Sequence, residues 1–195
     1  MARLNRRKVY LIVCEGKNKT EYNYLSHFRN DTIAIDLQKS EDTDPISMIK
    51  KTKHFIRKNK IDFKYGDKAF CLMDIDLDAS KANLIKQLQN ENPNITIITS
   101  NPCVESWFLF HFVKHPQTQN SSQSNKTYLK TFIPNYSEKM DVYAKVEKIK
   151  NNLKEAIENS QNKKRLLAQN YDLKSADAMH CTFIDDLILQ IFSEE

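Results

Sequence analysis

The sequence predicts an α/β fold, with a mostly parallel sheet flanked by helices and a helical extension at the C-terminal end. Short apolar segments alternate with segments of helical periodicity up to about residue 113, as expected of a parallel sheet with helical crossovers. Two of the apolar segments lack the polar alternation of a half-exposed strand, as is typical of strands buried on both faces. The chain also has only two glycines, too few for the many tight turns of a β-sandwich or barrel.

Eight elements make up this alternation. Residues 8–14 and 68–74 are expected to be buried strands because they are short, apolar and rich in β-branched and aromatic residues. Residues 33–37 alternate as in a half-exposed strand, and residues 95–99 form a further strand. Pro45 fits the first turn of a helix. Helices are expected where apolar residues recur at helical spacing, at residues 19–29, 45–60, 79–91 and 103–113.

The composition changes after residue 113. Residues 114–127 are rich in Gln, Asn and Ser, and this predicts a polar surface loop. Beyond the loop the pattern turns helical. An apolar stripe follows helical steps through Val142, Val146, Ile149, Leu153, Ala156 and Ile157, and a last short helix contains Phe183, Leu187 and Ile191. The expected organisation is an α/β domain over residues 1–113, a polar loop over 114–127 and a helical extension over 128–195 packed on the domain.

Charge and composition exclude several classes of protein. Lysine and arginine number 30 against 25 acidic residues, a net charge of +5 that is compatible with a nucleic-acid partner but weak evidence for one. With only Gly16 and Gly66, the chain has no glycine-rich nucleotide-binding loop. Neither composition nor charge indicates whether several copies of the chain assemble.

Cysteine usage and hydropathy predict a cytoplasmic protein without a membrane segment. None of the four cysteines has the Cys-x-x-Cys spacing of a metal or redox site, which favours buried reduced thiols. The apolar run from Val9 to Cys14 is too short for a signal peptide or a membrane span.

Acidic residues follow two of the predicted buried strands. Glu15 ends the first strand and precedes Gly16, while Asp74, Asp76 and Asp78 follow residues 68–73. The carboxyl ends of parallel strands meet at one edge of a sheet, where open α/β folds bind their ligands. Carboxylates that share such a crevice repel one another unless a cation lies between them, and oxygen ligands favour Mg²⁺ or Mn²⁺. The sequence therefore predicts a divalent metal site.

The spacing of the second cluster supports this prediction. On extended backbone the side chains of Asp74 and Asp76 point to the same side, so both can bind one octahedral cation. Asp78 has the same parity, but it can equally cap the helix that follows. Both interpretations of Asp78 stay open, and a solvated acidic turn is the alternative for the whole cluster.

Other charged residues near these strand ends are candidates too. Glu21 and Glu105 fall in the first turns of predicted helices, where a carboxylate is either a metal ligand or a partner of the helix dipole. Lys17 and Lys19 follow Glu15 and either bind a phosphate or are solvated. Lysines between residues 50 and 60 form a basic helix face that is open to the same two interpretations.

Several segments together resemble a known family. Glu15-Gly16 and Asp74-Ile75-Asp76 after strands resemble the Toprim domain, the metal-binding catalytic core of topoisomerases, primases and OLD-type nucleases. The segment Asn101-Pro102-Cys103-Val104-Glu105-Ser106-Trp107, together with Thr20-Glu21, Tyr136 and Lys139, is similar to the RloB family, which includes the second protein of the AbiL abortive-infection pair.

The resemblance implies a Toprim-like fold, one or two Mg²⁺ or Mn²⁺ ions, and nuclease activity on DNA or RNA in phage defence. Glu15 would be an acid/base or ligand, Asp74 and Asp76 would be ligands, and Glu21 and Glu105 match acidic family positions. It also implies an AAA- or ABC-type ATPase partner, and Lys139 joins Lys17 and Lys19 as a candidate phosphate contact. The chain departs from the family near its end, where only Thr182 matches the expected Asn-Pro-Ser-Thr.

Two alternatives to a nuclease stay open. One is an aspartate-dependent phosphatase of the Asp-x-Asp-x-Thr type, although Asp78 stands here in place of the threonine. The other is a non-catalytic or regulatory subunit that uses the fold to bind its ATPase.

Overall fold

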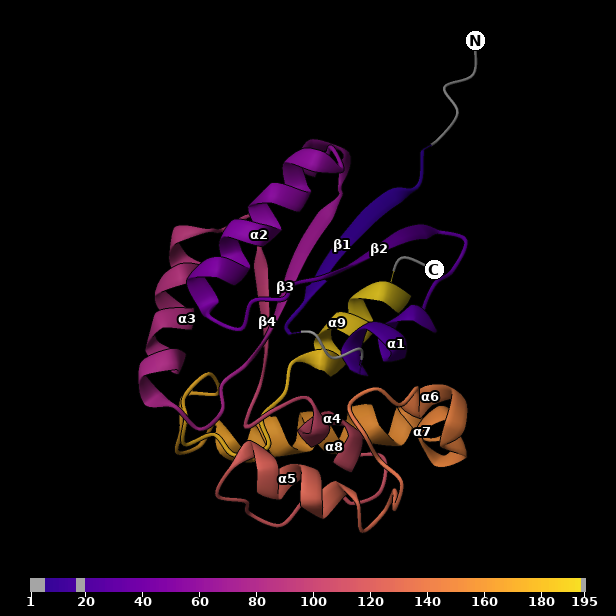
Figure 1. Ribbon diagram of the computed structural model, residues 1–195, viewed down its shortest axis with the longest axis vertical. Helices are drawn as coiled ribbons and strands as arrows, with labels where there is room; N and C mark the ends of the chain where they lie inside the picture. The colour runs from indigo at the N-terminus through magenta and orange to yellow at the C-terminus, as the bar shows by residue number, and fades with distance from the viewer. Residues whose placement is uncertain (1–5, 17–19, 194–195) are drawn as a thin grey trace.

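A computed structural model of the chain describes residues 6–16 and 20–193. Its centre is a four-stranded, all-parallel sheet in the order β2-β1-β3-β4 (Figure 1). The strands are β1 (Lys8–Cys14), β2 (Ile33–Lys39), β3 (Lys68–Asp74) and β4 (Thr96–Ser100). Helices flank the sheet, so the predicted α/β class is confirmed. The arrangement is consistent with a Toprim-like fold.

The central strands are buried on both faces, which explains why their sequences lack polar alternation. Tyr10 and Ile12 of β1 belong to one hydrophobic core, and Leu11 and Val13 belong to the other. Two helices cover the second core, α2 (Pro45–Lys58) and α3 (Ala79–Glu91), and a 3₁₀ turn (Phe63–Tyr65) precedes β3. The first core is covered by α1 (Thr20–Ser26) and α9 (Ile184–Phe192), on the other side of the sheet (Figure 1).

The remaining helices lie beyond the carboxyl ends of the strands, at the bottom of Figure 1. They are α4 (Glu105–Leu109), α5 (Ser122–Leu129), α6 (Val142–Lys145), α7 (Glu147–Asn151) and α8 (Leu153–Leu167). The apolar stripe predicted from Val142 to Ile157 is real, but the backbone leaves the helical conformation at Val146 and Asn152. The stripe is therefore divided among three helices, and α4 is shorter than the helix predicted over 103–113.

The prediction of a polar loop over residues 114–127 was wrong from residue 122 onward. Helix α5 begins at Ser122, because Ser121 caps it and exchanges hydrogen bonds with Ser124 in a capping box. Asn125 on this helix is fully buried and donates a hydrogen bond to Ser106 Oγ at 3.2 Å. Polar residues that would be solvated in a loop thus find partners inside the protein.

The C-terminal residues complete the core of the sheet. Leu187 and Ile188 of α9 are fully buried in the same cluster as Tyr10 and Phe70. An isolated antiparallel β-bridge also joins Ser100, the last residue of β4, to Thr182, and the hydroxyl groups of the two residues lie 2.9 Å apart. No helix within the described residues has the length and apolar character needed to cross a membrane.

Helix α9 offers a matched test of this packing. Leu187→Ala is expected to lower the free energy of unfolding by about 2–5 kcal/mol, because it leaves a cavity at a fully buried position. Leu189→Ala, on the same helix but 38% exposed, should cost less than about 1 kcal/mol. Urea denaturation followed by circular dichroism measures both values. Equal losses in the two variants would contradict the packing of α9 on the sheet.

Candidate metal centre

The two central strands end side by side, and one hydrogen bond joins their ends. Val13 of β1 pairs with Cys71 of β3 in the sheet. Glu15 follows β1, and its Oε2 accepts a hydrogen bond from the backbone N–H of Asp74 at 2.8 Å. The predicted proximity of Glu15 and Asp74 therefore follows directly from the parallel register.

The backbone does not continue as a strand beyond Asp74. Asp76 and Leu77 both adopt φ of +59°, in the left-handed region, so residues 75–78 form a tight turn. The expectation that Asp76 shares a face with Asp74 on extended backbone was wrong. Asp76 is exposed at the rim of the site, and its backbone N–H donates to the carbonyl of Pro102 at 2.8 Å.

The side chain of Asn101 holds the acidic turn at residues 75–78 in place. Its fully buried side chain accepts a hydrogen bond from the Leu77 N–H at Oδ1, at 3.2 Å. Its Nδ2 donates to the backbone carbonyls of Ser175, Ala176 and Ala178 at 3.3, 2.9 and 3.1 Å. One buried amide thereby connects the acidic turn to the coil that precedes α9.

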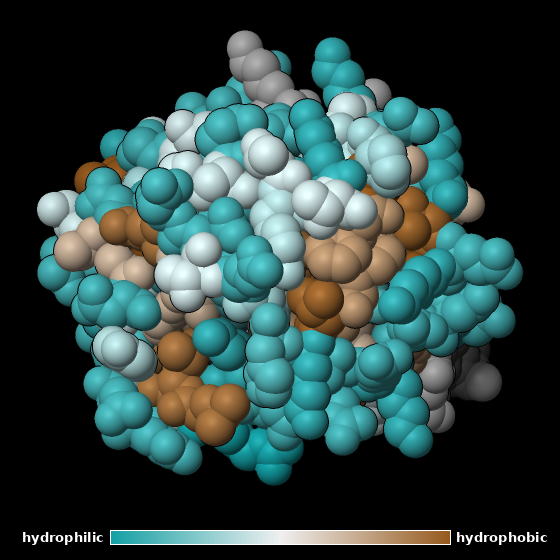
Figure 2. Space-filling model, turned by 90° about the horizontal axis from the view of Figure 1, so that it is seen from below, coloured by the Kyte–Doolittle hydropathy of each residue, from teal (hydrophilic) through white to brown (hydrophobic). Residues whose placement is uncertain are grey.

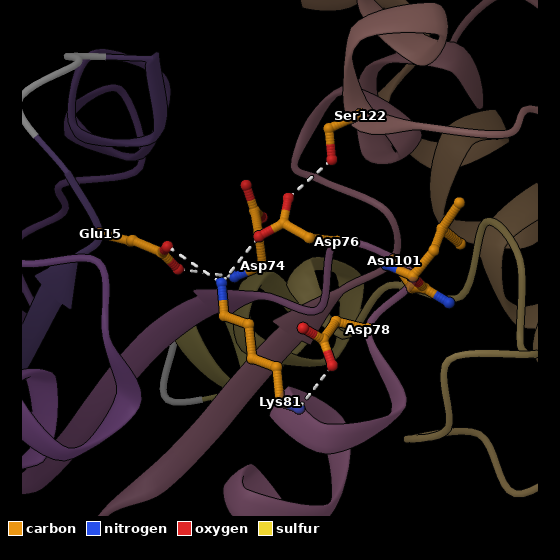
Figure 3. Close-up of polar contacts among 8 residues, drawn as sticks. Glu15, Asp74, Asp76, Asp78, Lys81, Asn101 and Ser122 are labelled. Carbon is orange, nitrogen blue, oxygen red and sulfur yellow. Dashed lines mark hydrogen bonds and ion pairs between the residues drawn. The ribbon is translucent and has the colours of Figure 1, made fainter.

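Asp78 caps α3. Its Oδ1 accepts hydrogen bonds from the backbone N–H groups of Ser80 at 2.7 Å and Lys81 at 3.0 Å. In Figure 3 its carboxylate lies on the helix side of the turn, apart from those of Glu15 and Asp76. The structure thus gives Asp78 the capping contacts that the sequence left as one of two interpretations.

Lys81 lies between two of the predicted site residues (Figure 3). Its Nζ is 3.3 Å from Glu15 Oε1 and 2.8 Å from Asp76 Oδ2. The second carboxylate oxygen of Asp76 accepts a hydrogen bond from Ser122 Oγ at 2.6 Å. The ammonium group offsets the repulsion between these carboxylates on the α3 side of the site.

On the other side, carboxylates surround a cavity of about 110 Å³. We call it the acidic pocket. Among the described residues, its lining includes the carboxylate residues Glu15, Glu21, Asp74, Glu105 and Glu138 and one cationic residue, Lys126. Glu21 and Glu105 come from the first turns of α1 and α4, so the structure brings both predicted candidates to the same place as Asp74.

Glu105 is almost fully buried, and only one of its two carboxylate oxygens has a hydrogen-bond partner among the described residues. The residue is 1% exposed, and its Oε1 accepts a hydrogen bond from the Tyr136 hydroxyl at 2.5 Å. Its Oε2 is buried and has no hydrogen-bond partner among the described residues. A buried, unpartnered carboxylate oxygen is costly, and a cation in the pocket would relieve that cost.

Burial raises the pKa of three acidic groups here. The pKa of Asp74 lies well above its ordinary value because the group is desolvated and because Glu15 and Glu21 add negative charge. Desolvation, with smaller contributions from Glu105 and Glu15, raises the pKa of Glu21 to about 8. The pKa of Glu15 is also raised by burial, although Lys81 acts in the opposite direction. The pocket therefore favours positive charge, either protons or a cation.

The donor set fits Mg²⁺ or Mn²⁺, because hard carboxylate oxygens dominate it. Among the described residues, however, no three acidic, histidine or cysteine side chains already converge on one point in the way that a formed metal site requires. Small side-chain movements would be needed for three of them to share one ion.

Three lysines were also predicted to contact phosphate. Lys139 lines a neighbouring cavity rather than the acidic pocket, and Lys17 and Lys19 lie outside the described residues. Sequence reasoning missed Lys81, Lys126 and Glu138. Lys81 lies five residues after Asp76, so a cation in the first turn of the following helix was an available signal. For Lys126 and Glu138 nothing in the sequence indicated their position.

The raised pKa of Glu21 predicts a pH dependence of stability for the metal-free protein. Between about pH 5 and 8 the folded state keeps a proton that the unfolded state releases, so stability falls as the pH rises, by up to about 1.4 kcal/mol per unit. Glu21→Gln should flatten this slope in urea denaturation with a chelator present, whereas Glu158→Gln, exposed on α8, should leave it unchanged. Asp74 and Glu15, whose pKa values are also raised, keep part of the slope in this variant, so a slope as steep in Glu21→Gln as in the wild type would contradict the burial of this carboxyl group.

Comparison with known proteins gives one positive result. A protein-family model described as RloB-like protein matches residues 10–191. No match is found among curated proteins or among solved structures. The matched range contains every described residue of the acidic pocket, strands β2, β3 and β4, and strand β1 from Tyr10 onward. Because the match extends over nearly the whole sequence, the chain belongs to the RloB-like protein family.

Proposed function

We propose that the protein is a metal-dependent nuclease that hydrolyses phosphodiester bonds of DNA or RNA. The observation that carries the proposal is the acidic pocket, in which Glu15, Glu21, Asp74 and Glu105 come together and Oε2 of Glu105 is buried without a hydrogen-bond partner among the described residues. Nothing in the packing of a strand end requires this concentration of buried negative charge. Carboxylates of this kind at the carboxyl ends of parallel strands are typical of divalent metal sites.

In this proposal Glu21, Asp74 and Glu105 hold one Mg²⁺ or Mn²⁺ ion. Such an ion supplies Lewis-acid activation of a phosphate oxygen and lowers the pKa of a bound water. The hydrogen bond from Tyr136 fixes the orientation of Glu105, and burial keeps bulk water away from both groups. A second ion would have to displace Lys81 from between Glu15 and Asp76.

Glu15 is the general base of the proposal. The Asp74 N–H and Lys81 hold its two oxygens, so its orientation is fixed at the edge of the acidic pocket. Burial raises its pKa, which makes it a better proton acceptor near neutral pH. Glu15 then takes a proton from the attacking water, and solvent protonates the leaving oxygen.

The biological role is also a proposal. The chain would be an effector of phage defence that acts together with an AAA- or ABC-type ATPase, as the resemblance to the RloB family implies. Cleavage of nucleic acid inside the cell is toxic, so such an effector would be held inactive until infection. The competing hypothesis is a non-catalytic subunit of the same complex, and it predicts that the purified chain binds no Mn²⁺ in calorimetry.

Two variants separate the ligands from the structural carboxylates. Asp74→Asn should lower Mn²⁺-dependent cleavage of single-stranded DNA and RNA at least about 100-fold, because the variant loses a charged metal ligand. Asp78→Ser keeps a helix-capping oxygen and should retain activity within about threefold. A gel assay of labelled oligonucleotides measures both rates. Full activity in Asp74→Asn would rule out the proposed centre.

Lys81 should compete with the metal. Lys81→Met removes the ammonium group that neutralises Glu15 and Asp76, so Mn²⁺ affinity in calorimetry is expected to rise about tenfold, or about 1.4 kcal/mol. The matched control is Lys86→Met on the same helix, whose ammonium group pairs with Asp172 and not with the site. Weaker binding in Lys81→Met would show instead that the lysine organises the carboxylates.

A further inference from the structure

A second cavity adjoins the acidic pocket. It measures about 430 Å³, and its lining includes Lys126, Lys130 and Lys139 together with Tyr136 and Glu138. We call it the lysine groove. Lys126 and Glu138 line both cavities, so the groove and the acidic pocket share one wall.

Local structure brings the three lysines together. Lys126 lies on α5, and Lys130 is the C-cap residue that directly follows the helix. The two residues are four positions apart, so their side chains lie on the same face of the helix. Lys139 lies in the segment that follows Tyr136. This segment is held in place because Thr20 Oγ1 donates a hydrogen bond to the Glu138 carbonyl at 2.6 Å. The Tyr136 hydroxyl reaches Glu105 inside the acidic pocket and anchors the groove to it.

The groove has an excess of positive charge. Lys126 forms an ion pair with Glu138. Lys130 and Lys139 are exposed, and neither forms an ion pair with any described residue. Partial burial disfavours the charged form of Lys126, but Glu138 and Glu105 outweigh this effect and raise its pKa, so the residue stays cationic. Among the described residues of the lining there are thus three lysines and one carboxylate.

The positive charge of the lysine groove matters because the acidic pocket beside it is negatively charged. Five carboxylates around the acidic pocket repel a polyanion, and a nucleic-acid strand needs compensating cations close by to approach. On the face over the helices at the bottom of Figure 1, hydrophilic side chains surround several apolar patches (Figure 2).

We propose that the lysine groove binds the phosphodiester backbone of a nucleic-acid strand and holds the phosphates next to the one that enters the acidic pocket. The inference deepens the proposed nuclease function and rests on it for the role of the acidic pocket. The volume of the groove falls within the range of about 300–1,000 Å³ that is typical of small-ligand sites, so it accommodates a short stretch of backbone. A lysine contact to a phosphate carries no direct sequence information, so binding through the backbone confers little sequence preference.

The test compares two double variants that remove the same charge. Lys130→Gln/Lys139→Gln removes the two unpaired lysines of the groove, and Lys50→Gln/Lys53→Gln removes two exposed lysines of α2 on the other side of the sheet. Binding of fluorescently labelled single-stranded DNA and RNA is measured by anisotropy with a chelator present, so that nothing is cleaved.

The groove variant should bind at least about tenfold more weakly than the wild type, and its plot of log affinity against log salt should be shallower by about 1.4. The α2 variant should match the wild type. No binding by the wild type, unchanged binding in the groove variant, or equal losses in both variants would each overturn the inference.

The same experiments separate the inference from the proposed function. If binding depends on the groove lysines but the wild type cleaves neither DNA nor RNA with Mn²⁺, the nuclease proposal fails and the groove stands. If cleavage requires Asp74 but binding is indifferent to Lys130 and Lys139, the groove proposal fails and the nuclease proposal stands.

Discussion

The hydrogen bond from the Asp74 N–H to the Glu15 carboxylate is the interaction on which the rest of the site depends. It exists because β1 and β3 are parallel neighbours, so both strands deliver their next residues to the same edge. The carboxylates of Glu15 and Asp74 therefore share one poorly solvated edge, which is unfavourable without positive charge nearby. Lys81 approaches this edge from α3 and Lys126 lines the pocket beyond it, and the space between them is what a divalent cation would fill.

The residues after 113 are part of the site and not only an appendage. Ser122 holds Asp76, Tyr136 orients Glu105, and Lys126 and Glu138 close one wall of the acidic pocket. Helix α9 meanwhile covers one face of the sheet. The chemistry of the strand ends therefore cannot be separated from the C-terminal half of the chain, although the two halves differ in architecture.

Much of the fold could be predicted because its signals are local. Unbroken apolar runs marked β1 and β3, and the residues that follow those runs identified Glu15 and Asp74. The turn at Asp76 was missed because its left-handed backbone is imposed by contacts with Pro102 and Asn101, which are distant in sequence. Lys126 and Glu138 were missed for the same reason, since only tertiary packing brings α5 and its following segment to the strand ends. Polarity misled the prediction for α5, whose buried Asn125 resembles a loop residue in sequence.

The buried amide of Asn101 has a mechanical consequence. Because it holds Leu77 with one atom and the carbonyls of Ser175, Ala176 and Ala178 with the other, the acidic turn and the C-terminal coil cannot shift independently. The coil reaches the surface a few residues earlier, at Tyr171, which is 48% exposed. A contact made at that surface would therefore act on the backbone that carries Asp76 through the Asn101 amide, and on α3 through the ion pair between Lys86 and Asp172.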